Sequence, residues 1–92
     1  MDYNLMNPNY KYDQLAAAIQ SRQHEYFHYD LDRANFVQML TTDLPDDYRT
    51  QIERRLVETE SRMAEVDSIY NALLSQIDNQ AAYDAAVARL SA

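Results

Sequence analysis

The sequence predicts an all-α fold: a long antiparallel helical hairpin of coiled-coil type, followed by a short C-terminal helix. Two observations lead to this prediction. The 92 residues contain no glycine and only two prolines, and tight β-hairpin turns normally need glycine because it takes positive φ at little cost. Between Ile52 and Ile77, apolar residues recur at alternating spacings of four and three, which is typical of a helix packed along another helix.

Residues 1–9 are expected to form an N-terminal arm, and residues 10–92 a single helical domain. The arm ends in Asn7-Pro8-Asn9, which has the chemistry of a turn. The first helix is predicted over about residues 10–41. One of its sides is largely apolar and carries Leu15, Ile19, Tyr26, Val37 and Leu40. Polar residues at 22, 23, 30 and 33 interrupt that side, so we expect either a bend near the middle or a partner for these groups.

The second helix is predicted over about residues 44–77. Asp43, Pro45 and Asp46 mark its start, because proline suits a first helical turn and acids suit the positive end of the helix dipole. Its apolar row consists of Ile52, Leu56, Thr59, Met63, Val66, Tyr70, Leu73 and Ile77. The row predicts one continuous buried strip. The opposite face carries residues spaced for i,i+4 ion pairs, among them Arg49 with Glu53 and Arg54 with Glu58.

A short third helix is predicted over about residues 79–91, with Tyr83, Ala86, Val87 and Leu90 on one face. A two-helix hairpin buries little apolar surface for its length, so we expect a homodimer that completes a four-helix bundle. Phe27, Leu31 and Phe36 lie off the main face of the first helix and are the predicted contacts. A monomeric three-helix bundle is the alternative.

Composition excludes several classes of site and partner. The chain has no cysteine, which excludes disulfides and thiolate metal sites. Its net charge of −7 disfavours binding to nucleic acid or to an anionic membrane. No apolar run approaches the roughly 20 residues that span a bilayer, and the N-terminus lacks the features of a secretion signal. A cytoplasmic protein is therefore expected.

His24-Glu25-Tyr26-Phe27-His28 matches the H-E-x-x-H pattern of zinc metalloproteases, in which two histidines bind zinc and the glutamate is the general base. The surrounding sequence departs from those enzymes: Leu31 and Ala34 stand where the extended motif has glycine and histidine. A helical projection also places both histidines opposite the apolar face. We therefore predict no protease activity and no bound cofactor.

Glu25 and His28 also form the E-x-x-H motif of ferritin-like di-iron bundles, where two further helices each contribute a glutamate. A hairpin that turns near Asp43 and Leu44 would place His28 at the level of Thr59, beside Glu58. The candidate metal ligands are thus His24, His28, Glu25 and Glu58, although Glu58 flanks the buried row.

The leading functional hypothesis is a non-enzymatic interaction or assembly protein that acts through helical surfaces, such as a small bacterial or phage accessory factor. Two alternatives are a di-metal carboxylate bundle and an acidic mimic of nucleic acid.

Overall fold

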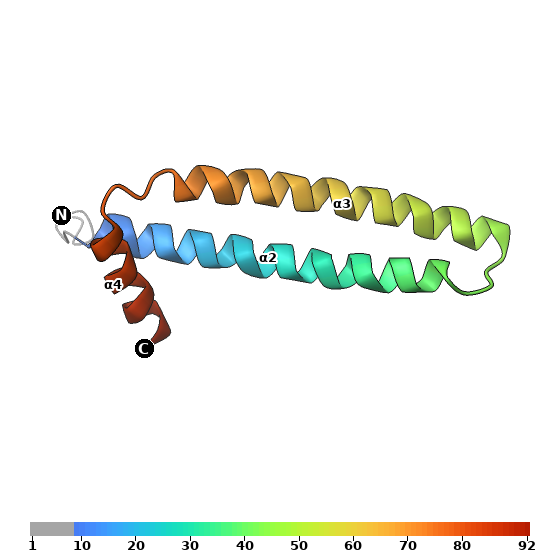
Figure 1. The fold of residues 1–92 in the computed structure, drawn as a ribbon, viewed down its shortest axis with the longest axis horizontal. Helices are drawn as coiled ribbons and strands as arrows, with labels where there is room; N and C mark the ends of the chain where they lie inside the picture. Colours follow the sequence, from blue (N-terminus) through green and yellow to red (C-terminus); the bar gives the residue numbers. More distant parts are fainter. Residues whose placement is uncertain (1–8) are drawn as a thin grey trace, which may run out of the picture.

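The computed structural model describes residues 9–92, which form three helices: α2 (Tyr10–Leu40), α3 (Asp46–Leu74) and α4 (Gln80–Ser91). Helices α2 and α3 run antiparallel as a hairpin, and α4 packs beside the start of α2 (Figure 1). The predicted all-α hairpin with a short C-terminal helix is confirmed. The predicted arm, apart from Asn9, lies outside the described residues.

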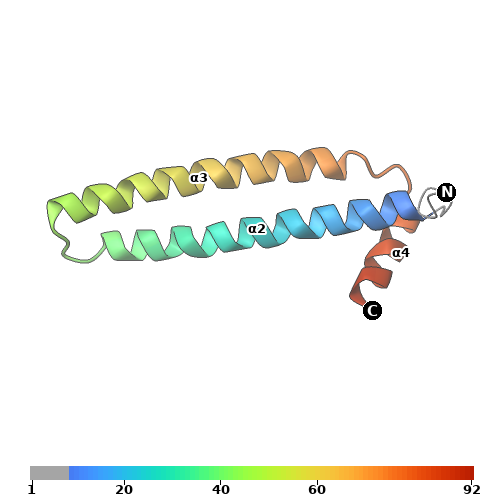
Figure 2. The same cartoon turned by 180° about the vertical axis from the view of Figure 1, so that it is seen from behind.

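The molecule is a rod of 60 × 24 × 22 Å with a radius of gyration of 18.8 Å. A compact chain of this length would have a radius of gyration of about 12 Å. Seen from behind, the hairpin has the same extended outline, with α4 projecting from one end (Figure 2). Most residues therefore lie in a layer only two helices thick.

Residues 41–45 connect α2 to α3, and local hydrogen bonds fix this turn. The hydroxyls of Thr41 and Thr42 donate to the carbonyls of Gln38 and Met39, both at 2.6 Å. Pro45, with φ −57° and ψ 147°, is the residue before α3. Arg49 does not pair with Glu53 as predicted; its guanidinium donates to the carbonyl oxygens of Leu40 at 3.1 Å and Thr42 at 3.0 Å. These bonds satisfy carbonyls that the end of α2 would otherwise leave without partners.

Helix α3 ends at Leu74, three residues before the predicted end at Ile77. The amides of Gln76 and Ile77 donate to the carbonyls three residues earlier, at 3.0 and 3.1 Å, so the last turn tightens. Asn79 then begins α4 by accepting a hydrogen bond from the Ala82 amide at 3.1 Å. The prediction of one helix through Ile77 is wrong in this last turn.

The predicted row of α3 faces α2, and no member of it is exposed. Ile52, Thr59, Met63 and Val66 are buried, and Leu56, Tyr70, Leu73 and Ile77 are half-buried. The facing row of α2, which we call the inner row, follows the same 4-3 spacing and consists of Leu15, Ile19, Arg22, Tyr26, Tyr29, Arg33, Phe36 and Leu40. Phe36, predicted to lie off this face, is half-buried, whereas Val37 is exposed.

Helix α4 packs against the first turns of α2. Ala86 on α4 and Ala16 on α2 are among the most buried residues; such small side chains let two helices approach closely. The Arg89 guanidinium on α4 donates two hydrogen bonds to the Asp13 carboxylate, at 2.6 and 3.1 Å. Val87 and Leu90, on the predicted apolar face of α4, stay partly exposed.

We expect Ile19→Ala to lower the free energy of unfolding by about 2–4 kcal/mol, because Ile19 is only 2 % exposed and its removal leaves a cavity in the inner row. Val57→Ala is the matched control: Val57 is 68 % exposed, and its truncation should change stability by less than about 0.5 kcal/mol. Urea unfolding followed by circular dichroism, at one fixed protein concentration, measures both. Equal effects of the two substitutions would contradict the assigned core.

Candidate interaction surface

The middle of the hairpin is hollow because the inner row of α2 carries arginines and tyrosines there. Arg22, Tyr26 and Arg33 cover the buried residues of α3 with their apolar parts and keep their polar ends in water. Two pockets open at this level. The larger, of ≈ 430 Å³, is lined by Arg22, Gln23, Tyr26, Phe27, Asp30, Val66, Asp67 and Tyr70.

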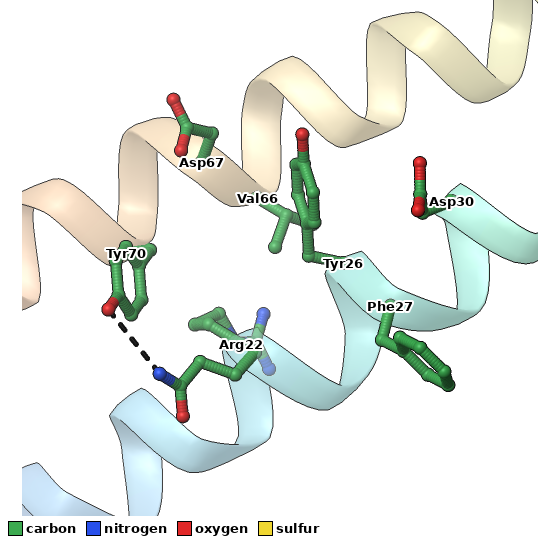
Figure 3. A pocket seen from close by; sticks show the side chains of 8 residues that line it. Arg22, Tyr26, Phe27, Asp30, Val66, Asp67 and Tyr70 are labelled. Atoms are coloured by element: carbon green, nitrogen blue, oxygen red, sulfur yellow. Dashed lines mark hydrogen bonds between the residues drawn. The ribbon is translucent and has the colours of Figure 1, made fainter.

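In this pocket, Tyr26 and Tyr70 form two walls and Val66 lies between them on α3 (Figure 3). The Gln23 amide donates to the Tyr70 hydroxyl at 3.4 Å and joins the two helices. Phe27 points away from α3 at the rim of the pocket (Figure 3). The pocket is therefore an aromatic hollow with an exposed phenyl ring at its edge.

The polar groups on this side of α2 are satisfied within the chain. Arg22 pairs with Glu25 at 3.2 Å, and Arg33 pairs with Asp30 at 2.6 Å. With Gln23 bonded to Tyr70, none of the four positions that interrupt the apolar side needs an outside partner. Helix α2 runs as one helix from Tyr10 to Leu40. Of the bend and the partner that the sequence left open for these polar groups, the structure shows partners, and they lie within the same chain.

A second row on α2 points away from α3, and we call it the outer row: Ala17, Gln20, His24, Phe27, Leu31, Ala34 and Gln38. Its members also follow one another at alternating spacings of three and four, and every one is exposed. Phe27 and Leu31, at its centre, are 59 % and 47 % exposed. None of the seven carries a formal charge at pH 7.

The positions that flank the outer row are also nearly free of charge. On one side lie Ser21, His28 and Asn35; on the other lie Gln23, Asp30 and Val37. Asp30 is the only formal charge among these six, and it is paired with Arg33. The outward side of α3 differs, because Arg54, Glu58, Arg62 and Glu65 surround its exposed Val57 and Ile69. The two helices thus present outward surfaces of opposite character.

The candidate metal ligands do not converge. His24 and His28 are exposed on α2, Glu25 pairs with Arg22, and Glu58 is exposed on α3. Gln23 faces Tyr70, so His28, five residues along, lies at the level of Glu65 and not of Glu58. Within residues 9–92, no group of three or more histidine, aspartate and glutamate side chains could hold a metal ion.

Charged contacts fix the open end of the hairpin, where the chain passes from α3 to α4. The Asp78 carboxylate accepts hydrogen bonds from the Lys11 ammonium at 2.8 Å and from the Tyr12 hydroxyl at 2.7 Å. These two bonds lower the pKa of Asp78 below its ordinary value of 3.8, and the same contact raises the pKa values of Lys11 and Tyr12. Because 66 or 67 residues separate the partners, no local pattern of residues predicts this contact.

No family model, curated protein or solved structure matches this chain. In the part of the chain that the structure describes, none of the helices has an apolar stretch of the length that a bilayer span requires.

The outer row could not be predicted from apolar residues alone, because Phe27 and Leu31 are its only large apolar members. Counting uncharged residues at 4-3 spacing would have found it, because Gln20, His24 and Gln38 continue the row that Phe27 and Leu31 begin.

The Asp78 carboxyl should titrate below its ordinary pKa of 3.8, because Lys11 and Tyr12 stabilise its charged form. The contribution of this contact to stability is then fully present above the ordinary pKa and is lost as pH falls through the lowered value. An NMR titration of the side-chain carboxyl carbon measures it. Lys11→Ala and Tyr12→Phe should each move the pKa of Asp78 back towards 3.8, and Lys11→Arg should move it least. A wild-type value at or above 3.8 would show that the contact does not form.

Proposed function

We propose that this protein is a non-enzymatic helical interaction protein that self-associates through the outward face of α2. The observation that carries the proposal is the outer row: an exposed, uncharged row with Phe27 and Leu31 at its centre. Apolar side chains at 4-3 spacing are what one helix of a coiled coil offers to another. With 25 % charged residues, the chain has enough charge to occupy every exposed helical face, so an uncharged exposed face favours a role in binding.

The exposed area supports the same proposal. The chain has 6786 Å² of accessible surface and a mass of 10.8 kDa, whereas a compact monomer of that mass exposes about 5,500 Å². The difference, about 1,200 Å², is larger than the roughly 800 Å² that each partner buries in a standard protein interface. One self-association of ordinary size would remove about two thirds of this excess exposed area.

The lining of the pocket also favours a role in protein–protein binding over a role in catalysis. Two of the three charged groups that line it, Arg22 and Asp30, are already paired with side chains of the same helix. Aromatic walls with a protruding phenyl ring suit the packing of side chains, since tyrosine and phenylalanine bring large contact area with few rotatable bonds.

Sedimentation equilibrium or light scattering coupled to size exclusion tests the proposal. We expect a particle of twice the 10.8 kDa chain mass, with a monomer fraction that grows on dilution because association depends on concentration. If only the monomer mass were found at protein concentrations up to about 100 μM, self-association would be refuted. A Kd above that concentration corresponds to only a weak association.

A further inference from the structure

We infer that the occupant of the outer row is the α2 helix of a second copy of this chain, lying antiparallel, with the two-fold axis crossing the outer row midway between Phe27 and Leu31. This inference rests on the proposed function and adds to it the direction and the register of the pairing. In this arrangement Phe27 of each copy packs on Leu31 of the other, His24 lies over Ala34, and Gln20 lies opposite Gln38.

Charge indicates on which face two copies can meet. Each chain carries a net charge of −7, so two copies repel wherever charged surfaces meet. Asp30 is the only formal charge on the outer row and its flanking positions, and it is neutralised by Arg33 at 2.6 Å. The outward face of α3 would instead have to remove four exposed charged side chains from water, those of Arg54, Glu58, Arg62 and Glu65, and desolvation of charges costs free energy. The α2 face is thus where two copies approach at the lowest electrostatic cost.

The position of α4 favours the antiparallel direction. Helix α4 covers α2 at Asp13 and Ala16, immediately before the outer row begins (Figures 1 and 2). A parallel pair would bring two α4 helices to the same end of the interface, where each occupies the space beside α2. An antiparallel pair places the two α4 helices at opposite ends. Each α4 then lies next to the residues around Thr41 of the other copy, with Val87 and Leu90 partly exposed there.

Side-chain size favours the register. In a two-fold antiparallel pair centred midway between Phe27 and Leu31, a large residue meets a smaller or flexible one: Phe27 meets Leu31 and His24 meets Ala34. Large residues opposite small ones let the layers of a helical interface interdigitate. The terminal layers pair Gln20 with Gln38, whose amides can each donate and accept a hydrogen bond. The row from Ala17 to Gln38 is about 32 Å long, enough for a pairing of several layers.

Thiol cross-linking tests direction and register, since the natural chain has no cysteine. Three variants are made, Gln20→Cys, Gln38→Cys and the double variant, and each is treated with a short bis-maleimide. We expect the double variant to form a covalent dimer and each single variant to stay uncross-linked, because equal positions lie about 27 Å apart in the antiparallel pair. Efficient cross-linking of the single variants would show a parallel pair and overturn the inference. No cross-linking of any variant would also overturn it.

Charge substitution tests the surface by a second measurement. Phe27→Asp and Leu31→Asp each place a carboxylate in the predicted interface and should weaken dimerisation at least about tenfold. Val57→Asp is the control, on an exposed apolar residue of α3, and should leave the dimer intact. All three sites are exposed, so circular dichroism should show unchanged helix content. A wild-type dimer that survives Phe27→Asp would refute this surface but not self-association, whereas a monomeric wild type would refute both.

Discussion

The burial of the α3 row against α2 is the interaction on which the rest of the structure depends. Ile52, Met63 and Val66 lose almost all contact with water, and burial of such a side chain contributes about 1.5–3 kcal/mol. At the middle of the hairpin, the residues of α2 beside Met63 and Val66 are arginine and tyrosine. These side chains supply apolar stems to the contact and leave their polar ends in water, so no buried charge offsets the gain. The hairpin therefore closes along its length and still leaves an aromatic hollow between Tyr26 and Tyr70.

Polar contacts link the helices at the two ends of the hairpin. At the turn, Arg49 binds the carbonyls of Leu40 and Thr42; at the open end, Asp78 binds Lys11 and Tyr12. Exposed contacts of this kind add little stability individually, but they select one path for the chain among several of similar energy. The contact of Asp13 with Arg89 does the same for α4. In a molecule with so small a core, such contacts contribute to how the helices are oriented relative to one another.

The sequence predicted what depends on local pattern and missed what depends on distant partners. Absent glycine and the 4-3 row were enough to predict the hairpin, and each predicted helix boundary lies within three residues of the observed one. The inner row of α2 was identified only in part, because an apolar count favours Val37, which is exposed, over Arg22 and Tyr29, which are not. The early end of α3 is followed by the contact of Asp78 with Lys11 and Tyr12, and no local pattern contains that contact. For the candidate surface, Phe27 and Leu31 were found because they lie off the buried face, while the uncharged residues around them were not.

The two long helices differ in how many of their sides are suited to packing. Helix α3 has one apolar row and an outward face of alternating arginine and glutamate, as expected of a helix with water on its far side. Helix α2 has 4-3 rows on two opposite sides: the inner row, which includes Arg22 and Arg33, and the uncharged outer row. A helix with two such rows is typical of the interior of a bundle, where neighbours cover both. The hairpin supplies a neighbour for the inner row, and α4 covers only the start of the opposite side. The proposed pairing of two copies supplies the missing neighbour for the remainder, and it does so without bringing the charged faces of α3 together.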